Sequence, residues 1–146
     1  MTTRVLVAHD AGARIFEHRG RGKGLVQLSD VPFEDGRRHV GELDSDRQGR
    51  AFDRSGQGRH AFEPQQDAKE HAVQRFAKQL VQDLSRQCHN GEFRQLFIVA
   101  PPRFLGVLRD SLDGKLEKAL IGTLAKDLPR ATAEELEAQL SETLVL

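Results

Sequence analysis

The side chains best suited to chemistry lie in one long polar stretch, residues 33–66. Its central part places arginines among glycines and ends in Ser-Gly-Gln-Gly-Arg-His. A guanidinium can bind a phosphate through two parallel hydrogen bonds, so arginines in a glycine-rich loop are typical of contact with RNA. The stretch has no hydrophobic period, and connections of this length in compact domains are usually functional or disordered. We therefore predict an RNA- or ribosome-binding loop whose candidate residues are Arg47, Arg50, Arg54, Gly56, Gln57, Gly58, Arg59 and His60.

A simpler interpretation of the same arginines is ion pairing within the loop. The stretch also carries acidic residues, and its net charge is slightly negative. Only residues 47–60 are net basic, and this is where phosphate contact is expected. Both interpretations stay open on the sequence alone.

No group of residues predicts a metal or a cofactor. His39, His60 and His71 match no ligand spacing, and a single cysteine offers no thiolate partner. A two-metal nuclease would need carboxylates that converge from separate strands, whereas Asp10 and Asp127 occur in turn-like contexts. We therefore expect neither a metal site nor a cofactor.

The length and composition predict one globular domain. The chain has 146 residues, which suit a single domain (1–146) with 33–66 as its extended functional loop. Lys and Arg together number 22, as do Asp and Glu, so any attraction to a polyanion must be local. One cysteine excludes an internal disulfide, and the N-terminal apolar run Val5–Ala8 is too short for a signal peptide. These features predict a cytoplasmic protein without membrane insertion, and they leave the oligomeric state undefined.

The first half of the chain predicts a strand meander and a long helix. Continuous apolar residues indicate a buried strand over 3–9. Short turns then place two further strands, over 13–19 and 25–31, antiparallel to their neighbours. After the loop, apolar residues recur at helical spacing from Ala68, and Asn90-Gly91 ends this helix. Cys88 lies on the apolar face and is expected to be buried.

The second half alternates strands and helices. Residues 93–100 predict a central strand, and Pro101-Pro102 opens a helix. Residues 115–126 fit a helix by their leucine spacing and a strand by a short apolar run with an internal glycine; we choose a strand near 120–125. Thr132 begins the last helix with a capping box. The order predicts an α/β fold, with a mixed five-stranded sheet flanked by three helices.

Several phrases of the sequence resemble a bacterial family named for host attachment. They include Val5–Ala8, Ser45–Arg50, Lys126–Leu128 and the run Ala-Pro-Pro-Arg-Phe-Leu-Gly-Val-Leu-Arg at 100–109. The resemblance covers nearly the whole chain. That family is similar in fold to the middle domain of eukaryotic and archaeal peptide-chain release factors, a ribonuclease-H-like sheet flanked by helices. The resemblance therefore implies this fold, and it favours a strand within 115–126.

The same resemblance suggests what the polar loop does. In release factors the loop between the third strand and the long helix carries a Gly-Gly-Gln tip that reaches peptidyl-tRNA. The corresponding residues here are Ser55, Gly56 and Gln57. The resemblance thus implies a module that contacts RNA, tRNA or the ribosome through the loop.

Two alternatives accompany this function. Gln57 is the candidate catalytic residue of a peptidyl-tRNA hydrolase. Two glycines in such a tip let a backbone N–H point at developing negative charge. Ser55 replaces the first glycine and reaches such a conformation only at a cost of about 1 kcal/mol or more, so the non-enzymatic version is preferred. The second alternative, from the family's name, is a direct or indirect role in attachment to host cells without contact with nucleic acid.

Overall fold

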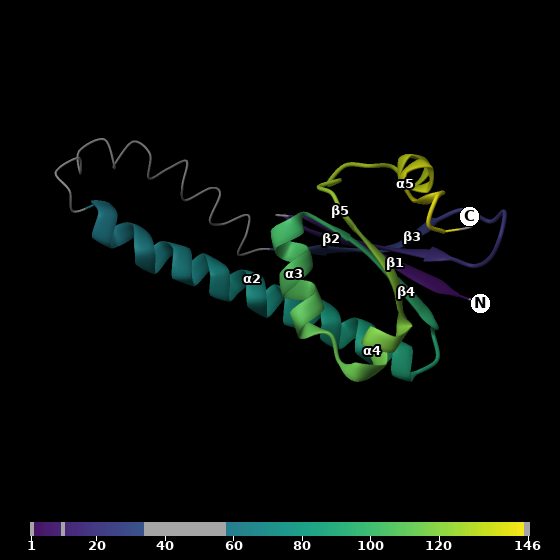
Figure 1. The fold of residues 1–146 in the computed structure, drawn as a ribbon, viewed down its shortest axis with the longest axis horizontal. Helices are drawn as coiled ribbons and strands as arrows, with labels where there is room; N and C mark the ends of the chain where they lie inside the picture. Colours follow the sequence, from purple (N-terminus) through teal and green to yellow (C-terminus); the bar gives the residue numbers. More distant parts are fainter. Residues whose placement is uncertain (1, 10, 34–57, 145–146) are drawn as a thin grey trace.

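A mixed five-stranded sheet forms the centre of the molecule (Figure 1). The computed structural model describes residues 2–9, 11–33 and 58–144, and it describes side chains within 58–144 only from residue 68. The strand order is β3-β2-β1-β4-β5, in which the first three strands form an antiparallel meander and β1, β4 and β5 are parallel. The strands are β1 (Thr3–His9), β2 (Gly12–His18), β3 (Val26–Pro32), β4 (Gln95–Ala100) and β5 (Leu120–Ala125). The predicted mixed α/β sheet is confirmed.

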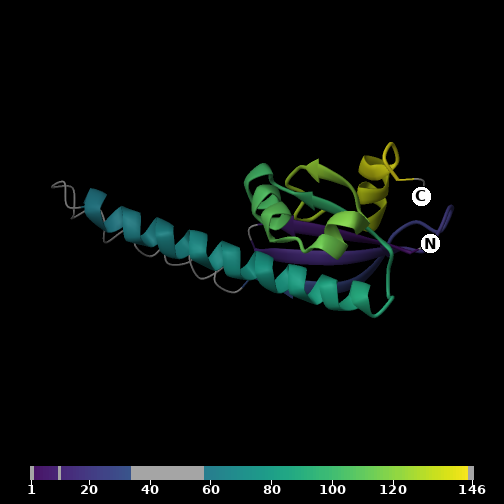
Figure 2. The same ribbon diagram turned by 60° about the horizontal axis from the view of Figure 1, so that its bottom comes forward.

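Helices cover both faces of this sheet (Figures 1 and 2). One face carries α2 (Gly58–His89), α3 (Pro102–Ser111) and α4 (Gly114–Ala119), and the other carries α5 (Ala133–Leu140). Successive side chains of a strand point to opposite faces. Leu6 and Ile98 therefore join the apolar cluster beneath α2, whereas Val5 and Val99 join the cluster beneath α5. This two-sided burial explains why β1 and β4 are apolar without alternation.

The helix α2 begins ten residues earlier than its apolar stripe predicted. The expected start was Ala68, but the helix starts at Gly58, so residues 58–66 are helical rather than part of a structureless loop. The last buried residue toward the N-terminus of α2 is Ala72, and residues 68–71 are exposed. Residues 68–71 therefore have no buried apolar face, which explains why the apolar stripe does not extend over them. Pro64 also lacks a backbone donor, a feature that disfavours a helix interior.

The strand chosen near 120–125 is confirmed, and the helical interpretation of 115–126 holds for the residues before it. A short helix, α4, ends at Ala119 and β5 follows at once from Leu120. The described part of the chain therefore has four helices around the sheet instead of the predicted three. The leucine spacing continues across the boundary: Leu116 is buried under α2, whereas Leu124 packs toward α5.

The helix ends match their sequence signals. Gly91 has φ +78°, and the N–H groups of Gly91 and Glu92 donate to the carbonyls of Cys88 and Gln87 at 3.0 Å each. This pattern is a Schellman motif, which ends α2 where Asn90-Gly91 predicted. The hydroxyl of Thr132 accepts a 3.1 Å hydrogen bond from the Glu135 N–H, as expected of an N-cap.

Asp113 caps α4 and ties it to α2. Its carboxylate accepts hydrogen bonds from the Leu116 N–H, at 2.8 Å, and from the Ser85 hydroxyl of α2. The Ser85 hydrogen bond is the main reason that the pKa of Asp113 lies below its ordinary value of 3.8. These contacts stabilise the ionised form of the side chain.

We expect Asp113→Ala to lower the free energy of unfolding by about 1 kcal/mol at pH 7, through the lost cap. Because the folded-state pKa is lowered, this contribution is fully present above pH 3.8 and fades as the pH falls below that value. Urea denaturation of the variant and the parent at pH 7 and pH 3 measures both effects. The exposed Asp110→Ala is a matched control, and an equal loss at both pH values would contradict the prediction.

Candidate functional site

The predicted site residues fall at the start of α2 and in the segment before it. Gly58, Arg59 and His60 are the first three residues of α2, and their side chains are outside the described part. The remaining candidates lie outside the described residues altogether: Arg47, Arg50, Arg54, Gly56 and Gln57. The structure therefore defines the support of this candidate site rather than its side-chain geometry.

That support is a helical arm. The helix α2 has 32 residues, which corresponds to about 48 Å at 1.5 Å per residue. Its N-terminal part extends well beyond the sheet and the other helices (Figures 1 and 2). We define the arm as residues 58–71, the part that precedes Ala72, the first buried residue among the described side chains of α2. The arm carries the start of the predicted site roughly 20 Å away from the body.

Three phenylalanines fix the base of the arm. The Phe33 ring follows β3 and stacks on the Phe76 ring of α2, with centroids 4.6 Å apart and an interplanar angle of 12°. The Phe76 ring meets the Phe104 ring of α3 edge-on at 6.0 Å. All three residues are buried, and we call this cluster the aromatic root. It joins Phe33, the first residue of the 33–66 stretch, to the helices α2 and α3 at one point.

The aromatic root lies at the end of the sheet formed by the carboxyl ends of its parallel strands, where ligands commonly bind. β3 runs in the same direction as β1, because it is separated from β1 by two antiparallel pairings. The carboxyl ends of four strands, β1, β3, β4 and β5, therefore lie at the same end of the sheet. Phe33 directly follows β3 at this end. In open α/β sheets the ligand sites lie at the carboxyl ends of the parallel strands. The arm thus leaves the body at the end of the sheet where ligand sites are most often found.

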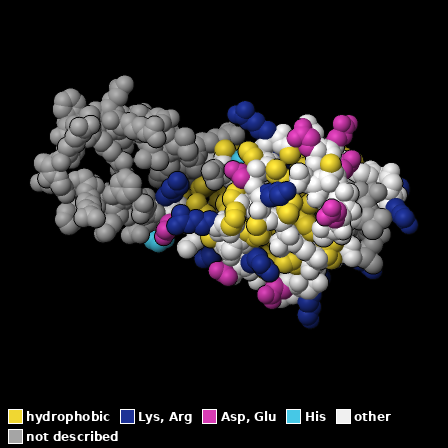
Figure 3. Space-filling model, turned by 45° about the horizontal axis from the view of Figure 1, so that its top comes forward, with side chains coloured by type: hydrophobic (Ala, Val, Ile, Leu, Met, Phe, Trp, Pro, Cys, Tyr) yellow, Lys and Arg dark blue, Asp and Glu magenta, His cyan; other side chains and the backbone are white. Residues whose placement is uncertain are grey.

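The two faces of the sheet differ in charge. Over their described side chains, α2, α3 and α4 contain eight Lys and Arg and four Asp and Glu. The helix α5, in contrast, contains three Glu and no basic residue. On the face in Figure 3, several Lys and Arg side chains lie on the side of the body from which the arm extends. A polyanion that approaches the arm would therefore meet the basic side of the molecule.

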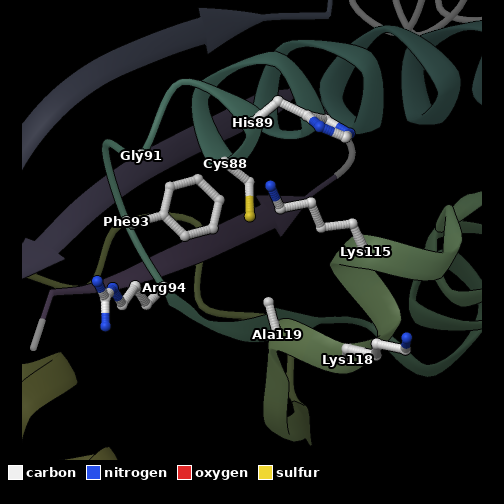
Figure 4. Close-up of a pocket in the computed structure, with 8 residues that line it drawn as sticks. All are labelled: Cys88, His89, Gly91, Phe93, Arg94, Lys115, Lys118 and Ala119. Atoms are coloured by element: carbon white, nitrogen blue, oxygen red, sulfur yellow. The ribbon is translucent and has the colours of Figure 1, made fainter.

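A hollow lies at the end of α2 opposite the arm (Figure 4). It has a volume of about 370 Å³, and Cys88, Phe93 and Ala119 form its apolar floor. The Lys115 side chain reaches toward Cys88, whereas those of Lys118 and Arg94 point away from Phe93 (Figure 4). The cations therefore do not converge on one point, and we do not assign a ligand to this hollow. As predicted, Cys88 is buried.

The ranges that the structure describes contain neither a cluster of metal-ligating residues nor a helix able to span a membrane. No group of three or more His, Cys, Asp or Glu among these residues could hold a metal ion. Within the same ranges, no helix combines the length and the apolar character that crossing a bilayer requires.

Sequence reasoning missed two features of this site. Phe33 was assigned to the polar loop, because one apolar residue after Pro32 has no period, yet it is buried in the aromatic root. Arg103 and Arg109 of α3 were seen only as part of a family phrase, although both are exposed on the basic side. Their spacing on the predicted helix was the available signal.

Together these features define a mixed α/β module that holds a helical arm away from its sheet. Its fold is similar to that of an archaeal translation termination factor, aRF1, with a TM-score of 0.53 and 12% sequence identity. The match covers 99% of this chain and 35% of that chain, so this chain spans about a third of the factor's length. At this identity the likeness concerns the fold.

The family is shown by a separate comparison. A family model described as "Protein required for attachment to host cells" matches residues 4–140, and the chain belongs to this family. A comparison with curated proteins found no match. The family and the release-factor-like fold implied by the sequence phrases are both confirmed.

Proposed function

We propose that this chain is a cytoplasmic RNA- or ribosome-binding module whose main contact is made by residues 44–60. The arm is the observation that carries the proposal. Its described side chains, residues 68–71, are exposed, so they contribute little apolar burial to the stability of the body. Short helices without packing are only marginally stable in water. A helix that nevertheless continues this far is best explained by a contact outside the molecule.

The charges suit a polyanionic partner. In this proposal Arg47, Arg50, Arg54 and Arg59 bind phosphates, while Gly56, Gln57 and Gly58 form the tip with His60 beside it. The basic helices on the arm's side of the sheet add longer-range attraction. The likeness in fold to a translation termination factor supports the ribosome as the partner. Hydrolysis of peptidyl-tRNA through Gln57 is the enzymatic version of the same contact.

The test is the combined replacement of Arg47, Arg50, Arg54 and Arg59 by alanine. We expect most co-sedimentation with purified ribosomes to be lost. The plot of log affinity for single-stranded RNA against log salt should also become shallower by about 3, since each phosphate contact contributes about 0.7. Both quantities are measured at several salt concentrations.

The matched control removes the same charge elsewhere. Arg21, Lys23, Arg94 and Arg130 are all exposed and lie outside both the proposed contact and the basic helices α2, α3 and α4. Their combined replacement by alanine should leave ribosome binding close to that of the parent. Equal pelleting of the 47/50/54/59 variant and the parent would contradict the proposed contact.

A role in attachment is a second candidate, and the family description favours it. The cellular location of the protein distinguishes this role from ribosome binding. Antibody labelling of intact and permeabilised cells measures whether a surface pool exists. A surface pool would support attachment and count against a ribosomal role, whereas labelling only after permeabilisation would support the first function.

A further inference from the structure

The outer face of α3 places a glycine between two arginines. Arg103, Gly106 and Arg109 follow one another at intervals of three residues and are all exposed, whereas Phe104 and Leu108 are buried beneath them. Residues three apart are neighbours on a helix surface. Gly106 therefore leaves a gap in the side chains between two guanidinium groups.

Nothing in the described part of the chain requires glycine at this position. Gly106 is not among the glycines with positive φ. A Cβ added there would meet no heavy atom within 4 Å. Glycine inside a helix is less stable than alanine, because it loses more conformational freedom on folding. A residue with a side chain would stabilise this helix more than Gly106 does. The exposed glycine backbone therefore suggests a contact with another molecule.

The two arginines are available for such a contact. Within the described ranges, neither Arg103 nor Arg109 has an ion pair or a hydrogen bond to its side chain. Both are long, fully charged side chains that bind phosphate oxygens in a fixed geometry. Asp110 is also exposed and bounds the basic strip at the C-terminal end of α3.

The position of α3 connects this strip to the arm. Phe104, the neighbour of Arg103 in sequence, packs edge-on against Phe76 in the aromatic root. The N-terminal end of α3 therefore lies beside the base of the arm (Figure 1). A partner that contacts the arm can continue onto α3 without crossing the acidic helix α5, which lies on the other face of the sheet.

We propose that the outer face of α3 is a second RNA-contact surface, on which a sugar–phosphate backbone passes over Gly106. Arg103 and Arg109 bind the phosphates on either side, and the missing side chain allows the close approach. This inference rests on the proposed function, because it names a further surface for the same RNA or ribosome.

The test is Gly106→Gln, with Gly114→Gln as its matched control. Both glycines are helical, and a Cβ at either would meet open space. Glutamine favours a helix, so we expect the melting temperature of the Gly106 variant to be unchanged or raised by about 2–4 °C. Its affinity for purified ribosomes and for single-stranded RNA should fall about tenfold, while the Gly114 variant binds like the parent. Arg103→Ala/Arg109→Ala should also weaken binding and make the salt dependence shallower by about 1–2.

The outcomes separate this surface from the proposed function. If the parent binds ribosomes and the α3 variants bind equally well, the α3 surface is overturned and the function stands. If the parent binds neither ribosomes nor RNA, the function and the α3 surface fail together. If Gly106→Gln leaves RNA binding intact but releases an acidic protein from a pull-down, the surface binds protein and the RNA assignment is wrong.

Discussion

Phe76→Ala is expected to lower the free energy of unfolding by about 3–5 kcal/mol. Phe76 is 4% exposed and contacts both other rings of the aromatic root. Its removal deletes the stacking on Phe33 and leaves a cavity between α2, α3 and the end of β3. Urea denaturation followed by circular dichroism measures the loss. Phe76→Leu keeps most of the volume and should cost clearly less.

Hydrogen exchange shows which elements lose stability in Phe76→Ala. We expect amide exchange in Phe76→Ala to rise first in α2 near the aromatic root and in α3, because these elements share the cavity. The helix α5 packs on the other face of the sheet and provides the internal control. A loss below about 1 kcal/mol, or exchange that rises equally in α5, would contradict the role of the three rings as the anchor of the arm.

Much of the fold follows from the sequence because two-sided burial leaves a strong signal. β1 and β4 are continuous apolar runs since each supplies side chains to both apolar clusters. The helix caps were visible because Gly91 and Thr132 satisfy specific backbone groups. The junction at Ala119–Leu120 was ambiguous because the leucine spacing runs on from α4 into β5, so a single pattern covers two elements.

Apart from the buried Phe33, the parts that the sequence did not predict lie outside the core. The start of α2 carries no apolar stripe, because its described residues before Ala72 face solvent. For the site, the residue types of 44–60 suggest phosphate contact, but their arrangement lies outside the described residues. The basic strip on α3 had a signal in the sequence, because Arg103 and Arg109 are spaced on the helix opposite its apolar residues. Phe104 and Leu108 define the buried face, and Arg103 and Arg109 then fall on the outer one.

The largest electrostatic effect is expected at Glu17. Arg4 of β1 and Glu17 of β2 are register partners, and their side chains are only 8% and 10% exposed. Arg4 Nη2 lies 3.8 Å from Glu17 Oε1, and the Arg4 guanidinium also donates to the Gln87 side chain and lies 5.2 Å from the centre of the Phe93 ring. Glu17 accepts a second, 2.8 Å contact from Arg19 Nε.

Glu17→Ala should therefore lower the free energy of unfolding by about 3–5 kcal/mol, because Arg4 would remain buried without a countercharge. The double variant Arg4→Met/Glu17→Leu should lie within about 1 kcal/mol of the parent, since it removes both charges and keeps the apolar volume. Urea denaturation of the parent, Arg4→Met, Glu17→Leu and the double variant forms a double-mutant cycle that isolates the pair. If the double variant is as unstable as Glu17→Ala, the loss comes from packing and hydrogen bonds rather than from the unpaired charge. A loss that vanishes at 1 M salt would show instead that the pair is open to solvent.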